Sequence, residues 1–351
     1  MKRLFRSKES VLGCLLVLVS LLVPFLVCEA AYRVKNVLRP QVLGEAIVPD
    51  ALLGWRIRPG YRFSGEKKDA SGRSRPVEIA VDGNGFREYG PERGRLRVFC
   101  LGDSFTFAKD VSQNETYYHV AGELAPADVF ACGVDGYGSM QEYLVLDQWI
   151  DRVKPDVVVW QFCLNDFIGN DVRLTRMSAK NQCQAPQPFL TPQGKVRYAS
   201  PGEGSLGRIA RYLPSAFLRA MAHRIDNRKG LPTLENTVET RIEKGDAAAL
   251  ALFRESVETT DRIMAKVRAR CGRLPIVAFN VDTKAPYHGA FREIFARHGI
   301  KLLDTVPALV QEAAAKGETV FAGDGAHWNA AGHRICGEVL AGVLKEVAGA
   351  R

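Results

Sequence analysis

The chain begins with a basic segment that is followed by an apolar stretch from Val11 to Val27, interrupted only by Gly13, Ser20 and Pro24. A transmembrane helix needs roughly 17–25 apolar residues, and basic flanking residues stay on the cytoplasmic side of the membrane. Residues 1–10 hold four basic residues and one acid. We therefore predict that residues 1–31 form a cytoplasmic tail and a single transmembrane anchor, and that residues 32–351 are exported.

A cleaved signal peptide is the alternative to an anchor. The residues that leave the apolar stretch, Cys28-Glu29-Ala30, make a poor small-x-small cleavage site. We therefore expect the segment to stay attached. The protein would then lie in a bacterial cell membrane, with its folded part on the periplasmic or extracellular side.

Two short regions follow the anchor. Residues 32–50 are expected to form a tether. Residues 51–95 contain short runs of alternating side chains, such as Val77-Glu78-Ile79-Ala80-Val81, and the turn-forming segment Asp82-Gly83-Asn84-Gly85. These runs predict a small β-rich extension.

From residue 96 onward, short apolar strands alternate with helical segments. The expected strands cover residues 96–101, 129–132, 156–162, 275–280 and 301–303. The expected helices cover residues 115–124, 139–152, 246–270, 290–298, 307–316 and a final helix capped by Asn329, and Asn114 is the expected cap of the first. This alternation predicts an α/β domain over residues 96–351, with a parallel sheet and helices on both faces.

Residues 171–245 interrupt the alternation and are expected to form an insertion. They hold 13 basic and 6 acidic residues. Between Arg208 and Arg228, apolar residues interleave with Arg211, Arg219 and Arg224. Two interpretations stay open: a solvated helix that packs one apolar face on the core, or a basic surface that contacts anionic lipid headgroups or an anionic glycan.

The formal net charge of the whole chain is +9, and most of this excess lies in the basic N-terminus and the insertion. The remainder is close to neutral, which argues against a uniform nucleic-acid-binding surface.

The sequence holds no Cys-x-x-Cys pair. A zinc ribbon or a thioredoxin-like redox motif is therefore excluded.

Candidate chemistry lies where the predicted strands end, because sites in open α/β sheets collect at the carboxyl ends of the strands. The first three strands are followed by Gly102-Asp103-Ser104, by the glycine-rich segment 133–138 and by Asn165-Asp166, and Asp324-Gly325-Ala326-His327 precedes the last helix. A hydroxyl, glycine amides, an amide side chain and an Asp/His pair are the groups that acyl transfer through a serine requires.

Ser104 is the candidate nucleophile, His327 the candidate base and Asp324 the acceptor that would fix the imidazole tautomer. The backbone N–H groups of Ser104 and Gly136 and the Asn165 side chain are candidates for an oxyanion hole. His333 is a second candidate base, which we expect to pack within the last helix instead.

These segments resemble the blocks of the SGNH (GDSL-like) hydrolase superfamily. The resemblance covers about residues 96–170 and 246–351. It implies a flavodoxin-like three-layer α/β/α fold, no metal and no cofactor. It also implies that the working residues are Ser104, Gly136, Asn165 and His327.

More narrowly, the chain resembles membrane-anchored bacterial members of that superfamily. The resemblance lies in two upstream elements, Gly54-Trp55-Arg56 and Asp82 to Arg87. One position departs from the pattern. The third block usually has glycine two places before its asparagine, and Cys163 stands there instead.

We therefore predict an exported serine esterase that hydrolyses O-acyl, especially O-acetyl, esters on cell-envelope carbohydrate. An O-acyltransferase that passes the acyl group to a glycan hydroxyl would use the same residues, and the sequence does not separate the two. A lipid or thioester hydrolase is a third possibility, and a non-catalytic glycan-binding module is the alternative from another class. No nucleic-acid partner is expected.

Overall fold

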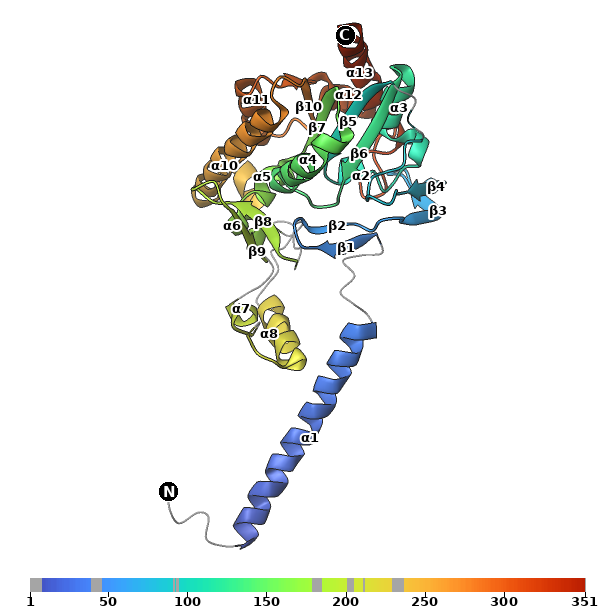
Figure 1. The fold of residues 1–351 in the computed structure, drawn as a ribbon. Helices are drawn as coiled ribbons and strands as arrows, with labels where there is room; N and C mark the ends of the chain where they lie inside the picture. The colour runs from blue at the N-terminus through green and yellow to red at the C-terminus, as the bar shows by residue number, and fades with distance from the viewer. Residues whose placement is uncertain are drawn as a thin grey trace. The chain divides into compact units, whose positions relative to one another are not determined.

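The computed structural model describes residues 8–38, 46–90, 92, 95–178, 185–200, 205–210, 212–228 and 237–350. It divides into two compact units. The N-terminal unit comprises residues 1–42 and 202–231, and the main unit comprises residues 43–201 and 232–351. Figure 1 shows the elements of both units.

The main unit is built on a five-stranded parallel sheet in the order β11-β10-β7-β5-β6. Its strands are β5 (Leu96–Gly102), β6 (Ala127–Gly133), β7 (Val157–Phe162), β10 (Ile276–Asn280) and β11 (Lys301–Leu302). The predicted three-layer α/β fold with a parallel sheet is thereby confirmed.

Helices cover both faces of this sheet (Figure 1). They are α2 (Ser104–Phe107), α3 (Tyr117–Leu124), α4 (Ser139–Val153), α5 (Leu164–Gly169), α10 (Ala247–Cys271), α11 (Tyr287–Arg297), α12 (Thr305–Ala315) and α13 (Ala330–Gly349). Strand side chains alternate between two apolar cores: Phe99 and Leu101 face the core that contains α4, α10 and α11, whereas Val98 and Cys100 face the core that contains α3, α12 and α13.

Of the two helix caps predicted from the sequence, the structure confirms one and contradicts the other. Asn329 caps α13 as predicted, because its side chain accepts hydrogen bonds from Ala331 and Gly332 N–H. The expected cap at Asn114 is wrong. Asn114 lies in a 3-10 turn, η1 (Gln113–Glu115), and Thr116 caps α3 two residues later.

The segment before the sheet forms two antiparallel hairpins. Strand β1 (Ile47–Asp50) pairs with β2 (Gly54–Ile57), and β3 (Arg62–Lys68) pairs with β4 (Ser74–Ala80). Helix α1 (Lys8–Leu38) continues into the range expected to be a tether, and β1 occupies the end of that range.

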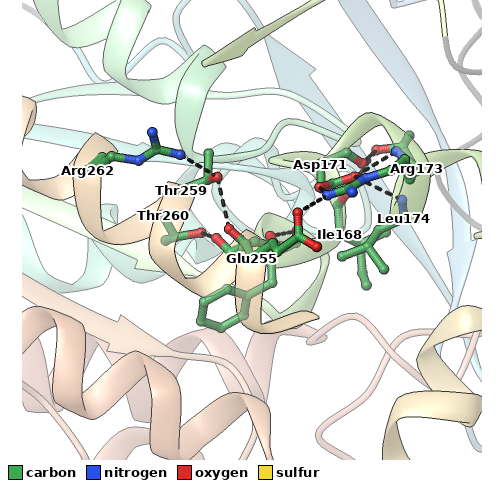
Figure 2. Close-up of polar contacts among 11 residues, drawn as sticks. Ile168, Asp171, Arg173, Leu174, Glu255, Thr259, Thr260 and Arg262 are labelled. Carbon is green, nitrogen blue, oxygen red and sulfur yellow. Dashed lines mark hydrogen bonds and ion pairs between the residues drawn. The ribbon is translucent and has the colours of Figure 1, made fainter. Parts of the chain in front are cut away.

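The insertion is divided between the two units. Its main-unit elements are α6 (Val172–Met177), β8 (Gln187–Leu190), β9 (Val196–Ala199) and α9 (Val238–Glu243). Figure 2 shows how this part is tied to α10: the Arg173 guanidinium contacts the Asp171 carboxylate and lies 2.7 Å from the Glu255 carboxylate. Nearby, Asn170 Nδ2 donates to the hydroxyl of Thr260, a residue of α10, at 2.9 Å. These contacts hold α5 and α6 to α10.

The N-terminal unit contains α1, α7 (Ser205–Ala210) and α8 (Ala216–Arg228). Over Val11–Val34, α1 is long and apolar enough to cross a membrane. A membrane anchor and a signal sequence both fit such a helix. Arg211 lies outside the described residues, as do the side chains of Arg208, Arg224 and Arg228.

His333 lies within α13 and is buried, in agreement with its expected packing role. Its Nδ1 accepts a hydrogen bond from Tyr117 N–H at 3.3 Å. Burial, with a smaller contribution from the positive charge of Arg87, lowers the pKa of His333 from 6.5 to about 3. Between these two values the unfolded chain binds a proton that the folded chain does not, so the free energy of unfolding falls as the pH falls.

We therefore expect His333→Asn to remove this part of the acid sensitivity, because the asparagine oxygen can still accept from Tyr117 N–H. Between pH about 6 and about 4, the wild-type protein should lose roughly 1.4 kcal/mol per pH unit more than the variant does. Chemical denaturation at several pH values measures this difference. Equal slopes would show that His333 is protonated in the folded protein.

Candidate active site

Ser104 lies at a sharp turn between β5 and α2. At the end of β5, a Cβ on Gly102 would lie 2.3 Å from the Gln161 side-chain oxygen, so only glycine fits there. The following residue, Asp103, is fully buried, and its carboxylate caps α2 by accepting from Phe105 N–H at 3.0 Å. These contacts fix Ser104 at the first position of α2, where its side chain remains partly exposed.

A continuous series of hydrogen bonds joins Ser104 to His327 and Asp324. The Ser104 Oγ lies 2.7 Å from His327 Nε2. The other ring nitrogen, Nδ1, contacts the Asp324 carboxylate. That carboxylate also accepts from the backbone N–H groups of Ala326 at 2.9 Å and His327 at 3.0 Å. The structure thus brings together the three residues that the sequence singled out from distant segments.

The charge of Asp324 follows from these contacts. Partial burial alone would raise its pKa, but the hydrogen bonds from Ala326 N–H and from the ring and N–H of His327 outweigh burial and lower the pKa to about 2. Asp324 is therefore ionised near neutral pH. An ionised acceptor keeps a proton on His327 Nδ1 and leaves Nε2 free to accept the proton of Ser104.

The imidazole of His327 is oriented by aromatic packing. The Phe105 ring, which follows Ser104 in the chain, lies 5.0 Å from the His327 ring. Phe105 also contacts Trp328 edge to face at 5.1 Å, and Trp328 is buried. Because Trp328 is the neighbour of His327, this packing limits the movement of the loop that carries His327.

The loop over residues 320–329 is pinned to the end of β3. Asp69 and Ala322 form an antiparallel bridge, and Gly323 N–H donates to the Lys68 carbonyl at 2.8 Å. The two chains approach so closely that a Cβ on Gly323 would lie 2.9 Å from that carbonyl oxygen. The β-rich extension therefore supports the loop that carries Asp324 and His327.

Gly136 lies in the loop between β6 and α4, in the left-handed conformation with a φ of +78°. Trp55 of β2 is hydrogen-bonded to the residue before Gly136 and to the residue after it. Its indole N–H donates to the Asp135 carbonyl at 3.0 Å, and its own carbonyl accepts from the Tyr137 hydroxyl at 2.6 Å. The Gly-Trp-Arg element noted in the sequence thus braces the loop that carries Gly136.

Asn165 lies in the first turn of α5, after β7. Its Nδ2 donates to the buried Asp103 carboxylate at 2.8 Å, which connects the Asn165 loop to the Ser104 turn. The glycine that the superfamily usually has before this residue is not required here, because Cys163 adopts an extended backbone with a φ of −138°. Cys163 N–H also donates to Asp166 at 2.8 Å, which stabilises the turn.

Arg87 has a structural role beside the site that the sequence did not reveal. Its buried guanidinium donates to the carbonyls of Phe107 at 3.0 Å, Ala108 at 3.2 Å and Val111 at 3.2 Å. The first of these carbonyls belongs to the last residue of α2 and the other two follow it, so Arg87 holds the C-terminal end of the Ser104 helix and the chain after it. The sequence offered one indication of this role, since Arg87 ends the Asp82–Arg87 element. The carbonyls that Arg87 binds could not be predicted, because they are brought to it by tertiary packing.

Charged side chains also surround the site. Lys109 forms an ion pair with Asp135 at 3.0 Å, and partly buried Asp110 lies near Asp324 and His327. One potential ligand atom from each of Asp110, Asp324 and His327 lies within 4.8 Å of the others, an arrangement that could hold a cation. Since both ring nitrogens of His327 already contact Ser104 and Asp324, a cation there would have to displace one of these contacts.

Comparison with known proteins identifies a family to which this sequence is similar. The GDSL-like Lipase/Acylhydrolase family matches residues 100–335. Among solved structures, a member of the lipolytic protein G-D-S-L family from Veillonella parvula is 13% identical, with a TM-score of 0.38, and the match covers 69% of this chain and 94% of that chain. An acetylxylan esterase from Geobacillus stearothermophilus is 12% identical, with a TM-score of 0.35, and the match covers 73% of this chain and 95% of that chain.

No curated protein sequence matches the chain. The assignment rests on the family match, which spans the Ser104 turn, the Gly136 and Asn165 loops and the loop that carries Asp324 and His327. The chain belongs to the GDSL-like lipase/acylhydrolase family and is an ester-hydrolysing enzyme.

Proposed function

We propose that the protein is a membrane-anchored serine esterase that hydrolyses O-acyl esters, most simply O-acetyl esters, on a carbohydrate of the cell envelope. The observation that carries this proposal is the hydrogen-bonded series from Ser104 through His327 to ionised Asp324. In this arrangement a weak nucleophile, a base and an acceptor that orients the base lie in contact before any substrate binds.

In the first half of the reaction, Ser104 Oγ attacks the ester carbonyl while His327 Nε2 takes the hydroxyl proton. Asp324 stabilises the imidazolium that forms. The tetrahedral intermediate then expels the carbohydrate alkoxide, which receives the proton from His327. In the second half, His327 takes a proton from water while the water oxygen attacks the acyl carbon. The bond to Ser104 Oγ then breaks, and His327 returns the proton to that oxygen, which restores the free enzyme and releases the carboxylic acid.

The developing oxyanion requires hydrogen-bond donors that are in place beforehand. We assign this role to the backbone N–H groups of Ser104 and Gly136 and to the side-chain amide of Asn165. One hydrogen of Asn165 Nδ2 is used by Asp103, which fixes the orientation of the amide and leaves the second hydrogen for substrate. The left-handed Gly136 keeps side-chain atoms away from the approaching ester.

Hydrolysis is favoured over acyl transfer to a second sugar. A transferase must keep water away from its acyl-enzyme. Residues 323–326 are exposed, and the Asp324 side chain keeps 43% of its accessible surface. The loop that carries Asp324 and His327 is therefore open to water, which supports hydrolysis. Family membership argues against the non-catalytic glycan-binding alternative.

Two further observations support the location and the substrate class. Phe217 at the N-terminus of α8 contacts two residues of α1: its N–H donates to the Glu29 carboxylate, and its ring packs against Tyr32. Cleavage near residue 30 would separate Glu29 from Tyr32. This favours a retained anchor over a cleaved signal sequence.

Around the site, the charged groups of Lys109, Asp110 and Asp135 suit a hydroxyl-rich substrate better than a long acyl chain.

We predict that the detergent-solubilised full-length protein hydrolyses nitrophenyl acetate. Ser104→Ala and His327→Ala should each lower kcat by about 10³-fold or more, and the double variant should be little worse than either, because the two residues act as a unit. His288→Ala, a histidine of α11, serves as the control and should retain wild-type turnover. Full activity in Ser104→Ala would contradict the mechanism.

A second prediction concerns the support of the Gly136 loop by Trp55. Trp55→Phe keeps the ring but removes the N–H that donates to Asp135. We expect kcat to fall roughly 10-fold to 100-fold with little change in KM, because the loop would serve a charge that exists only in the transition state. Trp149→Phe, whose ring packs on Phe86, is the matched control. Equal kinetics for Trp55→Phe and wild type would remove Trp55 from the support of the site.

A further inference from the structure

Exposed apolar side chains gather in one short region of the N-terminal unit. We call residues 205–228, which contain α7 and α8, the α7–α8 hairpin. Seven of its large apolar side chains are exposed: Leu206, Ile209, Tyr212, Leu213, Leu218, Met221 and Ile225. The last three recur at intervals of three and four residues and therefore lie on one face of α8. Soluble proteins rarely leave such a face uncovered.

The hairpin is attached to the membrane-spanning helix by a cap. The Glu29 carboxylate of α1 accepts hydrogen bonds from the Ser215 hydroxyl at 2.7 Å, from Ala216 N–H at 3.1 Å and from Phe217 N–H at 3.0 Å. The first N–H groups of a helix have no partner within the helix, and the positive end of the helix dipole favours an anion. A side chain of α1 thus completes the N-terminus of α8.

Aromatic contacts reinforce the cap on both sides. The Phe217 ring lies 6.0 Å from Phe25 and 5.7 Å from Tyr32. Phe25, Glu29 and Tyr32 are spaced by four and three residues, so they share one face of α1. Arg33 contacts Glu29 and also donates to the Pro214 carbonyl at 3.2 Å. The hairpin is therefore fixed at one height along α1.

If α1 spans the membrane as proposed, that height corresponds to the surface of the bilayer. The apolar stretch of α1 ends at Val27, and Glu29 is the first charged residue after it. A spanning helix leaves the hydrocarbon where its apolar stretch ends, and tyrosines such as Tyr32 are enriched at this depth. The exposed apolar face of α8 is thus held beside the headgroup region. The sequence of the hairpin contains five arginines and one acid, which suits contact with anionic phosphate groups.

We infer that the α7–α8 hairpin lies in the headgroup region of the membrane, at the point where α1 emerges. Its exposed leucine, isoleucine, methionine and tyrosine side chains would enter the boundary between headgroups and acyl chains, and the net positive charge of its sequence would favour anionic lipid. The partner is a bilayer that contains anionic phospholipid. The inference rests on the proposed anchoring by α1, and the experiment below separates the two.

The test places a fluorescent reporter on the hairpin of the full-length protein. Tyr212 is 84% exposed, so Tyr212→Trp should not disturb packing. The variant is reconstituted into vesicles of phosphatidylcholine and phosphatidylglycerol. The natural tryptophans all lie in the main unit and supply a constant background. Leu309→Trp, at an exposed leucine of α12, is the matched control.

We expect the added emission of Tyr212→Trp to shift to shorter wavelength and to be quenched by phosphatidylcholine brominated near the headgroup end of its acyl chains. Bromine near the methyl ends should quench less. Omission of phosphatidylglycerol should weaken the quenching. The emission added by Leu309→Trp should respond to none of these changes.

Flotation of the vesicles supplies the second readout. If the protein floats with the vesicles but Tyr212→Trp is not quenched, the anchor is present and the inference about the hairpin is wrong. If the protein does not float, the anchoring fails and the inference fails with it. A spectral shift caused by an acidic polysaccharide but not by lipid would assign the hairpin to a glycan and would also overturn the inference.

Discussion

The hydrogen bond between Ser104 Oγ and His327 Nε2 joins residues that are 223 positions apart in the chain. Its 2.7 Å length requires the β5–α2 turn and the loop before α13 to be held in place independently, because neither segment can position the other through one contact. The two apolar cores place the strand ends, and the buried Asp103 carboxylate then connects the Ser104 turn to the Asn165 side chain. The polar site therefore depends on a buried carboxyl group at the end of an apolar sheet, with a hydrogen bond to each of its oxygens.

The β-rich extension supplies the remaining constraints. Trp55 holds the Gly136 loop, the end of β3 at Lys68 holds the loop that carries His327, and Arg87 holds the chain after α2. Each contact reaches a different loop of the candidate site from the same short region. The extension is therefore part of the active-site scaffold, although it lies outside the residues that match the family.

The sequence predicted those features that are encoded locally. Apolar strands, their polar ends and the Asn329 cap could be read from neighbouring residues, and the candidate residues Ser104, Asp324 and His327 come together in the structure. The cap at Asn114 failed because Thr116, two residues later, offers a competing side chain to the same helix end. The contacts of Trp55 and Arg87 could not be predicted, because both side chains bind backbone carbonyls of distant loops, and backbone groups leave no signal in a sequence. For the same reason, the capping of α8 by Glu29 was visible only in the structure.

The central claim is that Ser104 is a nucleophile activated by His327. Labelling of the full-length protein with a fluorophosphonate, followed by peptide mass spectrometry, tests this claim most directly, because the reagent reacts with activated serines and needs no knowledge of the natural ester. The account predicts one modified serine, Ser104, with labelling that is rapid in the wild-type protein and strongly slowed in His327→Ala. Labelling at another serine, or labelling of Ser104 at the same rate without His327, would contradict it.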